Sequence, residues 1–491
     1  MKFIDDYLNT ITMYRLMLNG LFVLVFVSVV FGFAGILPYG GISLLASFIT
    51  LTVTCYVSNY IFSKIFKVQI NIESSSITAL ILFFLLFPIT KIADLPIFVL
   101  VGVLAMASKY ILVIKKKHIF NPTAISIFIV GLFGSGVVSW WVGSSVMLIP
   151  VAILGFLILR KVSRFELFFS FLVVSLSASV MSFLYLRHGV DLKDILQMFT
   201  SGPIIFLGAI MLTEPLTTPP TKKLQMYYGV LVGVLYGAQF SIGPLYSTPE
   251  FALIVGNLFS YIVSSRARLV LTLVEKNKLS ADVYDFVWQS SQKLKFRAGQ
   301  YLEWTLGHKN PDQRGNRRYF TIASSPTEDR LHLSAKFYPN SSSFKKCLLG
   351  MEMGEQIIAS QLSGEFVLSE DISQKLVFIA GGIGVTPFRS MVKFLLDKEE
   401  KRDIVLLYSA KTDQDFVYKD IFDSASIFGL RTIYTIDRID EEKIKNEVPD
   451  YKERMFYISG PHGMVTAFED TLQKIGVKNS QIKTDFFPGY V

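Results

Sequence analysis

Three side chains within one short segment have the types and spacing to hold a planar ligand that carries a phosphate. Residues 316–326 read NRRYFTIASSP and include Arg318, Phe320 and Thr321. An aromatic ring stacks on a flat heterocycle, a hydroxyl hydrogen-bonds the edge of that heterocycle, and a planar guanidinium grips a phosphate. On a strand, Arg318 and Phe320 share a face. We therefore expect Arg318, Tyr319, Phe320 and Thr321 to bind FAD, with Phe320 and Thr321 at the reacting ring.

A second segment supplies the start of a helix. Residues 336–348 read KFYPNSSSFKKCL, with Lys336 before a serine-rich turn and with Ser342 and Ser343 where a helix should begin. Unpaired N–H groups at a helix start bind anions. We expect these three residues to contact the phosphates of the same FAD.

A glycine turn at residues 381–387, GGIGVTP, lies between an apolar run and a helical pattern. Glycine lets the backbone approach a phosphate closely, and proline suits the first turn of a helix. The expected ligand is NADH or NADPH. No arginine pair follows YSAK, at 408–411, which favours NADH, but Lys411 can still hold a 2′-phosphate. The predicted contacts, at this turn and at two later strand ends, are Gly381, Gly382, Gly384, Thr386, Pro387, Ser409, Lys411, Gly460, Pro461 and Met464.

The elements that must position these groups form two predicted domains. Residues 269–372 alternate in the manner of an antiparallel β-barrel. Residues 373–491 alternate strands with helices, as in a Rossmann-like α/β domain. Ligands of such α/β sheets bind at the carboxyl ends of the strands, which is where the glycine turn and Ser409 fall.

Taken in order, the motifs RRYFTIAS, GGIGVTP, YSAK, SGPHGM and DFFPGY resemble the ferredoxin–NADP reductase family over residues 269–491. The resemblance implies a β-barrel FAD domain, a nicotinamide domain and an NAD(P)H-dependent flavoprotein oxidoreductase. It also implies that a C-terminal aromatic residue covers the flavin. Phe486, Phe487 and Tyr490 are the candidates, with Phe487 expected at the reacting ring and Phe486 at the cofactor. Phe320 stands where many members have tyrosine, and Ser459 where NADPH-specific members often have cysteine.

The first 268 residues have a different composition. The whole chain is 51% hydrophobic and 18% charged, with a mean hydropathy of +0.46. Residues 1–268 contain 18 Lys/Arg and 9 Asp/Glu, so the net charge of +9 lies entirely in this half. A nucleic-acid-binding protein would gather its basic residues on a soluble face. The pattern argues against that class and predicts a polytopic membrane domain over residues 1–268.

About ten apolar runs make up this half, and a bundle of about ten helices is the predicted fold. A span needs about 20 apolar residues, and the third, sixth, eighth and ninth runs are short for that. Broken helices are tolerated where protein or a cavity surrounds them. The runs are residues 16–36, 42–62, 75–90, 95–113, 121–138, 144–159, 166–186, 201–213, 225–241 and 249–264.

The charges between the runs predict an orientation. With the N-terminus inside, 15 of the 18 basic residues of this half fall on the cytoplasmic side, in agreement with the positive-inside rule. An even number of spans also returns the chain to the cytoplasm before residue 269. We expect a multi-pass protein of the inner (cytoplasmic) membrane, in contact with lipid, with its N-terminus and its FAD/NAD(P) domain in the cytoplasm.

Two stretches of the apolar half place proline and small polar residues at a helix boundary, KHIFNPTA at 117–124 and LTEPLTTPP at 212–220. Proline removes a backbone donor, and the freed polar groups can line a site or simply form a turn. With the intervening WWVGSSVMLIPVAILGFLILRKVSRFE, these stretches resemble a ten-helix membrane subunit. The subunit is shared by Rnf-type ferredoxin:NAD oxidoreductase, as its D subunit, and by the sodium-translocating NADH:quinone oxidoreductase, as its B subunit. The likeness covers roughly residues 10–265.

That resemblance implies a redox role for the membrane half. Family members carry FMN covalently on a threonine in a Ser-Gly-Ala-Thr-like loop. The Ser-Gly pairs here read SGVV at 135–138 and SGPI at 201–204, without that threonine. The expected occupant is a non-covalent flavin (FMN or riboflavin) or a quinone, and the electrons go to a quinone, an unknown acceptor or another redox protein. The predicted membrane redox site comprises Lys117, Asn121, Thr123, Thr213, Glu214 and Thr217.

The numbers of cysteine and histidine residues limit which other electron carriers the chain can hold. Cys55 and Cys347 are the two cysteines, too few for a four-thiolate iron–sulfur cluster, and no metal site is expected. Only two of the five histidines lie in the apolar half, whereas a pair of haems needs stacked histidines within helices. Two alternatives are kept: a haem-containing transmembrane reductase of the ferric reductase or NADPH oxidase kind, and a transporter or scaffold with a degenerate reductase domain.

Overall fold

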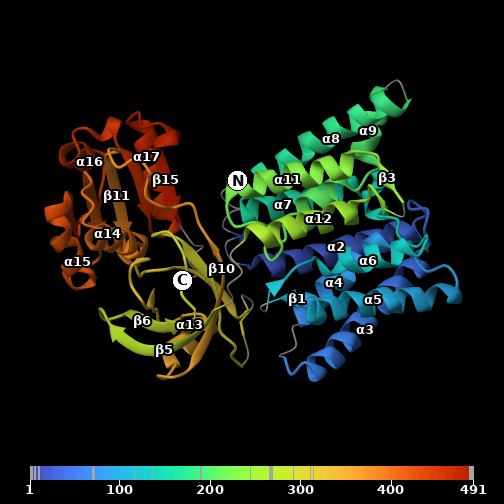
Figure 1. Cartoon of the computed structure of the whole chain (residues 1–491), viewed down its shortest axis with the longest axis horizontal. Coiled ribbons are helices and arrows are strands. Elements are labelled where there is room, and N and C mark those ends of the chain that lie inside the picture. Colours follow the sequence, from blue (N-terminus) through green and yellow to red (C-terminus); the bar gives the residue numbers. More distant parts are fainter. Residues whose placement is uncertain are drawn as a thin grey trace. The chain divides into compact units, whose positions relative to one another are not determined.

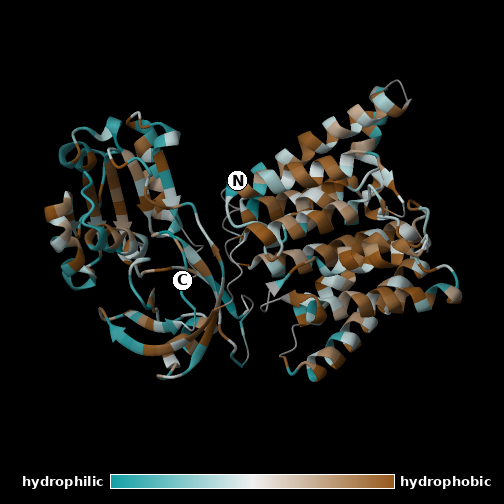
Figure 2. Cartoon of the chain, in the orientation of Figure 1, coloured by the Kyte–Doolittle hydropathy of each residue, from teal (hydrophilic) through white to brown (hydrophobic). Residues whose placement is uncertain are grey.

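The computed structural model describes residues 4, 7–8, 11–68, 72–114, 117–134, 136–187, 191–243, 245–264, 269–290, 292–309, 311–312 and 315–485. It divides into two compact units, Met1–Arg266 and Ala267–Val491 (Figure 1). Hydrophobic residues dominate the helices of the first unit, whereas the second is more polar (Figure 2).

Helices form the N-terminal unit, and one lies on each of the ten predicted apolar runs. They are α2 (Met13–Phe33), α3 (Gly41–Ile65), α4 (Ile72–Leu85), α5 (Leu95–Ile111), α6 (Pro122–Leu132), α7 (Leu148–Val162), α8 (Phe165–Arg187), α9 (Leu192–Thr200), α10 (Ile204–Phe206), a π-helix η4 (Leu207–Met211), α11 (Lys222–Gly237) and α12 (Pro249–Val263).

Only some of these helices have the length and composition of a membrane span. Among the described residues five do, and a sixth is added if the pair Lys193–Thr200 and Ile204–Met211, bent by 53°, is one span. The helices Ile72–Leu85, Pro122–Leu132 and Pro249–Val263 are apolar but shorter. The count of about ten spans therefore stays a prediction.

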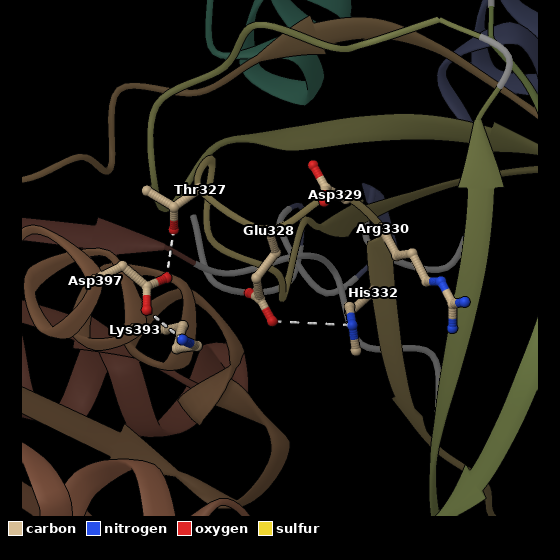
Figure 3. Close-up of a pocket in the computed structure, with 7 residues that line it drawn as sticks. All are labelled: Thr327, Glu328, Asp329, Arg330, His332, Lys393 and Asp397. Atoms are coloured by element: carbon tan, nitrogen blue, oxygen red, sulfur yellow. Dashed lines mark hydrogen bonds and ion pairs between the residues drawn. The ribbon is translucent and has the colours of Figure 1, made fainter.

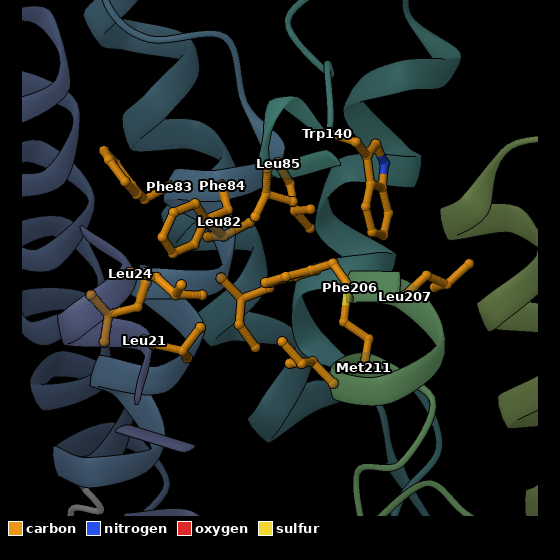
Figure 4. Close-up of a cluster of buried hydrophobic side chains, with 14 of the residues drawn as sticks. Leu21, Leu24, Leu82, Phe83, Phe84, Leu85, Trp140, Phe206, Leu207 and Met211 are labelled. Atoms are coloured by element: carbon orange, nitrogen blue, oxygen red, sulfur yellow. The ribbon is translucent and has the colours of Figure 1, made fainter. Parts of the chain in front are cut away.

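Apolar side chains lie on both the inside and the outside of this unit. Leu21 of α2, Phe84 of α4 and Phe206 of α10 are buried in its core, where the rings of Phe84 and Phe206 are 6.0 Å apart (Figure 4). On the outside, Phe26 is 69% exposed and Ile42 is 76% exposed. Contiguous exposed apolar surface is rare on soluble monomers and is what a lipid environment favours.

The order of elements in this unit repeats. In the first half, helices α2 to α5 precede a two-stranded hairpin, and α6, which begins with proline, follows it. In the second half, helices α7 to α11 precede another hairpin, and α12, which also begins with proline, follows it. The hairpins are β1–β2 (Val113–Ile114, Lys117–His118) before α6 and β3–β4 (Ser241–Ile242, Leu245–Tyr246) before α12. Matching helices of the two halves pack together, α2 on α7 and α6 on α12. The repeat thus brings the two proline-initiated helices into contact.

The C-terminal unit opens with a curled, six-stranded antiparallel sheet (Figure 1). Its order is β8-β7-β10-β5-β6-β9, and β8 and β9 are not paired with each other in the described part of the chain. Closure into a barrel therefore remains a prediction. The strands are β5 (Leu269–Lys278), β6 (Val283–Ser290), β7 (Tyr301–Thr305), β8 (Arg317–Thr321), β9 (Leu331–Lys336) and β10 (Gln356–Ser363), with helix α13 (Ser343–Gly350) between the last two.

A five-stranded parallel sheet follows, in the order β13-β12-β11-β14-β15. Strand β11 is buried along its whole length, as expected for the centre of a parallel sheet covered by helices on both faces. The strands are β11 (Leu376–Gly381), β12 (Ile404–Ser409), β13 (Leu430–Thr435), β14 (Met455–Ser459) and β15 (Ile482–Asp485). The helices are α14 (Thr386–Lys398), α15 (Lys419–Ser424), α16 (Glu441–Glu447) and α17 (His462–Lys474).

Candidate functional site

Strand β8 presents two of the predicted flavin-binding residues on one face. The guanidinium carbon of Arg318 lies 5.4 Å from the ring centre of Phe344, and the ring of Phe320 lies 5.9 Å from the same ring. The alternation of side chains along a strand accounts for this shared face. Tyr319 points the other way, and its hydroxyl donates to Glu303 Oε2 (3.1 Å).

A carboxylate of the protein, that of Asp312, is bound beside this face. Asp312 accepts a hydrogen bond from Arg318 Nη2 through Oδ1 (3.3 Å) and one from the Ser343 N–H through Oδ2 (3.0 Å). Its own N–H donates to Ser343 Oγ (2.9 Å), and His308 Nε2 lies 2.9 Å from the same oxygen. A guanidinium and a helix-start N–H together form an anion-binding site. Neither Asp312 nor His308 was among the predicted residues.

Two other predicted phosphate contacts have different roles in the structure. Ser342 is the N-cap of α13 and accepts from the Lys345 N–H (3.3 Å). Lys336 pairs with Asp282 (3.0 Å) and with Asp415 (3.9 Å). The capping residue therefore stays beside the anion site, while the Lys336 ammonium is engaged by carboxylates of two other loops.

The glycine turn lies at the carboxyl edge of the parallel sheet, as predicted. Gly381 ends β11 and is paired with Ser409 at the end of β12. Gly382 has φ +53°, in the left-handed region that glycine tolerates. A Cβ on Gly384 would lie 2.5 Å from the Ser459 carbonyl oxygen, so only glycine fits there.

Most of the remaining predicted nucleotide contacts lie around this turn. A Cβ on Gly381 or Gly460 would collide with the side chain of Met464, and Pro461 also lies next to Gly381. Thr386 and Pro387 begin α14. Lys411 follows β12 and is exposed. These residues therefore share one sheet edge, where a nucleotide phosphate can approach bare backbone.

A carboxyl group that the sequence did not single out joins the two sheets. Asp485 ends β15 and pairs with Ser459, which in turn pairs with Ala380 beside the glycine turn. Across the gap between the sheets, the Thr321 hydroxyl donates to Asp485 Oδ2 (3.5 Å). Burial raises the pKa of Asp485 to about 7. A hydroxyl and a titratable carboxyl group thus lie where the predicted flavin and nicotinamide sites meet.

Four predicted site residues lie wholly or partly outside the described residues. Phe486, Phe487 and Tyr490 lie outside the described residues. Lys117 belongs to β2, and only its backbone is described. Among the described residues, no group of three or more His, Cys, Asp or Glu side chains is arranged to hold a metal ion.

Four of the six predicted membrane residues form a hydrogen-bond network in which Asn121, Thr123 and Thr217 are buried and Glu214 is partly buried. Asn121 caps α6, and its Nδ2 donates to Glu214 Oε2 (2.7 Å). Thr217 donates to the same carboxylate oxygen (3.3 Å), and the Thr123 hydroxyl donates to Asn121 Oδ1. Thr213 is fully buried but donates to the preceding π-helix η4, at the Ala209 carbonyl (2.8 Å).

Two further residues extend this network, and the sequence did not identify them. The N–H of Asn121 donates to Asn257 Oδ1 (2.8 Å), and Asn257 Nδ2 donates to the Tyr228 hydroxyl (3.0 Å). Asn257 lies in α12 and Tyr228 in α11. The proline-initiated helices α6 and α12 are therefore joined by a polar contact inside the apolar unit.

Comparison with known proteins identifies the class of the C-terminal unit. A family model described as the oxidoreductase NAD-binding domain matches residues 378–470. Flavohemoprotein A of Dictyostelium discoideum is 22% identical over 205 residues, which cover 38% of this chain and 52% of that protein. The glycine betaine monooxygenase reductase subunit of Chromohalobacter salexigens is 24% identical over 227 residues, 42% of this chain and 60% of that protein.

Among solved structures, the cytochrome b5 reductase domain of Ulva prolifera nitrate reductase is similar. Its TM-score is 0.41 at 20% identity, over 45% of this chain and 97% of that one. The chain spans between half and about 60% of the length of the curated relatives named above. The family model and the curated relatives indicate an NAD(P)H-dependent oxidoreductase domain that binds FAD and a nicotinamide nucleotide.

Proposed function

We propose that the chain is a membrane-bound flavoprotein oxidoreductase. NAD(P)H reduces FAD in the cytoplasmic C-terminal unit, and the electrons pass to a non-covalent flavin or a quinone in the N-terminal unit. The protein is multi-pass in the inner membrane. The observation that carries the first half of this proposal is the anion site at Arg318 and the Ser343 N–H, next to the half-buried ring of Phe320 on the same strand face.

The residues of this site fit FAD. The Asp312 carboxylate occupies the position that suits a phosphate oxygen, because both of its partners are anion donors. We infer that an FAD phosphate takes the place of this carboxylate and that the loop around Asp312 moves aside. Phe320 would then stack on the flavin ring, and the Thr321 hydroxyl would hydrogen-bond its edge.

The same geometry brings the nicotinamide to the flavin. FAD supplies the chemistry, because it accepts a hydride from NAD(P)H and passes the electrons on singly or in pairs. The protein holds the nucleotide against the backbone of Gly381 and Gly384, at the edge of the sheet where β15 carries Asp485. Thr321 and Asp485 can hold a proton beside the reacting ring. We expect NADH to be preferred over NADPH.

The second half of the proposal concerns the network around Asn121 and Glu214. Ionisable groups inside an apolar helical unit are costly and commonly mark a functional site. Here the carboxylate of Glu214 meets a helix N-cap and lies just after the π-helix η4, a kind of helix found often at functional sites. The resemblance of this half to a redox subunit makes a flavin or a quinone the favoured occupant.

Purification in mild detergent, followed by an absorption spectrum and acid precipitation, tests the proposal. We expect flavin absorption that NADH bleaches, and flavin that acid releases completely, since no covalent attachment is proposed. A haem Soret band would instead support the transmembrane haem reductase. Protein without flavin and without NAD(P)H oxidation would support a degenerate reductase domain and contradict the proposal.

A further inference from the structure

One face of α14 holds the turn that follows the flavin strand. Arg389 donates through Nη1 to the Ala323 carbonyl oxygen (3.0 Å) and through Nη2 to Glu328 Oε1 (2.8 Å), and Nη1 also pairs with Glu328 Oε2. The neighbouring Ser390 hydroxyl donates to the Ser324 carbonyl oxygen (2.6 Å). Side chains of the nicotinamide domain therefore hydrogen-bond both the backbone and a side chain of the segment that follows Thr321.

These contacts belong to a closed ring of side chains. The Arg389 guanidinium lies over the ring of Tyr418 (5.6 Å), and the Tyr418 hydroxyl lies 2.5 Å from Ser334 Oγ. Ser334 donates to Asp285 Oδ1 (2.6 Å), and Asp285 Oδ2 lies 2.7 Å from His332 Nδ1. His332 Nε2 then faces Glu328 Oε1 at 4.0 Å (Figure 3), which returns the ring to Arg389.

Three members of the ring, Asp285, Ser334 and Arg389, are buried and the other three are partly buried, and the members come from both domains. Asp285, His332 and Ser334 lie on the paired strands β6 and β9, whereas Arg389 is in α14 and Tyr418 precedes α15. Arg389 is 5% exposed. Tyr418 has φ +64°, a strained conformation for a bulky residue. Burial raises the pKa of Tyr418 well above its ordinary value, so the hydroxyl stays neutral.

An open groove of about 600 Å³ runs over this seam. It does not indicate a ligand, because its charged side chains already have partners. Lys393 pairs with Asp397, which also accepts from Thr327 (2.5 Å) (Figure 3). Arg330 pairs with Glu275. The groove is therefore the outer side of the contact between the domains.

The ring connects the two cofactor sites without touching the predicted contacts of either. Arg389 lies in the first turn of α14, three residues after Thr386 at the nucleotide turn. Its carbonyl partner, Ala323, lies two residues after Thr321 on the flavin side. We therefore expect a change in the Arg389–Glu328 contact to shift the nucleotide turn relative to the flavin strand.

We propose that Arg389 is a positioning residue for hydride transfer, and that the ring sets the separation of nicotinamide and flavin. This inference rests on the proposed reduction of FAD by NAD(P)H. Reacting atoms must lie about 3–3.5 Å apart, and a misplacement of about 1 Å costs about 100-fold in rate. We expect NADH affinity and FAD affinity to depend less on that separation, because most of the contacts predicted for each ligand lie within one domain.

The test uses the full chain in detergent and two conservative variants. Arg389→Lys keeps the charge but loses the planar fork that reaches Ala323 and both Glu328 oxygens, and Glu328→Gln keeps the size but loses the charge. Stopped-flow bleaching of the flavin at increasing NADH gives the limiting rate of reduction and the half-saturating concentration. We expect the limiting rate to fall at least tenfold in both variants, with half-saturation and FAD content changed less than twofold.

Arg431→Ala is the matched control. Arg431 lies in β13 and pairs with Glu447 inside the nicotinamide domain, away from the seam, so its loss should leave the limiting rate within twofold. If Arg389→Lys and Glu328→Gln reduce flavin at the unaltered rate, even with a lower melting temperature, the ring only holds the domains together and the inference is wrong. Loss of FAD from both variants would contradict it too. Failure of the unmodified protein to reduce FAD would instead overturn the proposed function.

Discussion

Replacing Asp312 with alanine should tighten FAD binding. In the structure this carboxylate holds Arg318 Nη2 (3.3 Å) and the Ser343 N–H (3.0 Å), the two donors that we assign to an FAD phosphate. A hydrogen bond to a charged group contributes about 1.5–3 kcal/mol net. The Asp312 side chain is 29% exposed, so solvent screening favours the lower end of that range. Since about 1.4 kcal/mol is a factor of ten in affinity, we expect the FAD dissociation constant to fall about tenfold.

The assay is a titration of flavin-stripped, full-length protein with FAD, followed by the quenching of flavin fluorescence. Asp312→Asn should lie between the original protein and Asp312→Ala, because the amide oxygen still accepts from Ser343 but carries no charge. Glu370→Ala removes an acid whose side chain is 88% exposed and pairs only with Arg297 among the ion pairs of the described residues, so it controls for net charge. Its dissociation constant should change less than twofold.

Unchanged or weaker FAD binding by Asp312→Ala would refute this reasoning. It would mean that the carboxylate supports the fold of the flavin strand and its loop, and that the phosphate binds elsewhere. Tighter binding by Glu370→Ala of the same size as by Asp312→Ala would instead point to a general charge effect.

Three further predictions test the remaining parts of the site. Arg318→Ala should weaken FAD binding about tenfold or more in the same titration, because a phosphate loses its charge-assisted fork, and a variant that purifies with full FAD would remove Arg318 from the site. Deleting residues 486–491 should change NAD(P)H kinetics while FAD stays bound, and unaltered kinetics would exclude Phe486 and Phe487 from hydride transfer. Burial raises the pKa of Asp485 to about 7, so the native state binds this proton more tightly than the unfolded state does. The free energy of unfolding contributed by Asp485 should therefore fall as pH rises from about 4 to about 7, by at most about 1.4 kcal/mol per pH unit. Asp485→Asn should flatten that part of the melting-temperature profile, and an unaltered profile would show that Asp485 titrates normally.

Local sequence patterns were sufficient for part of the site. Strand alternation predicts that Arg318 and Phe320 share a face, and the glycine turn predicts its own place at a sheet edge, because both depend on neighbouring residues. The Asn-Pro pair likewise predicts that Asn121 starts a helix, which it does as the N-cap of α6. In each case the determining contacts lie within a few residues.

Contacts between distant residues were beyond that kind of prediction. Asp312 meets Ser343 31 residues later, and Asp485 meets Thr321 across 164 residues. An acid in a polar loop has no local signal that distinguishes it from any other surface acid. Arg389 reads as an ordinary helical arginine, and only the packing of the two sheets shows that it is 5% exposed and grips Ala323.

The electron path into the membrane half is the central claim, and one experiment tests it most directly. The full chain and its Asn121→Leu/Glu214→Gln variant are placed in liposomes with NADH outside. A membrane quinone analogue and ferricyanide in the outer solution serve as alternative acceptors. Asn121 and Glu214 share a partly buried hydrogen bond of 2.7 Å, and neither lies in the C-terminal unit. We predict that the variant reduces ferricyanide within twofold of the original rate but reduces the quinone analogue at least tenfold more slowly. If the variant reduces both ferricyanide and the quinone analogue at the original rates, the N-terminal unit is only an anchor and the claim is wrong.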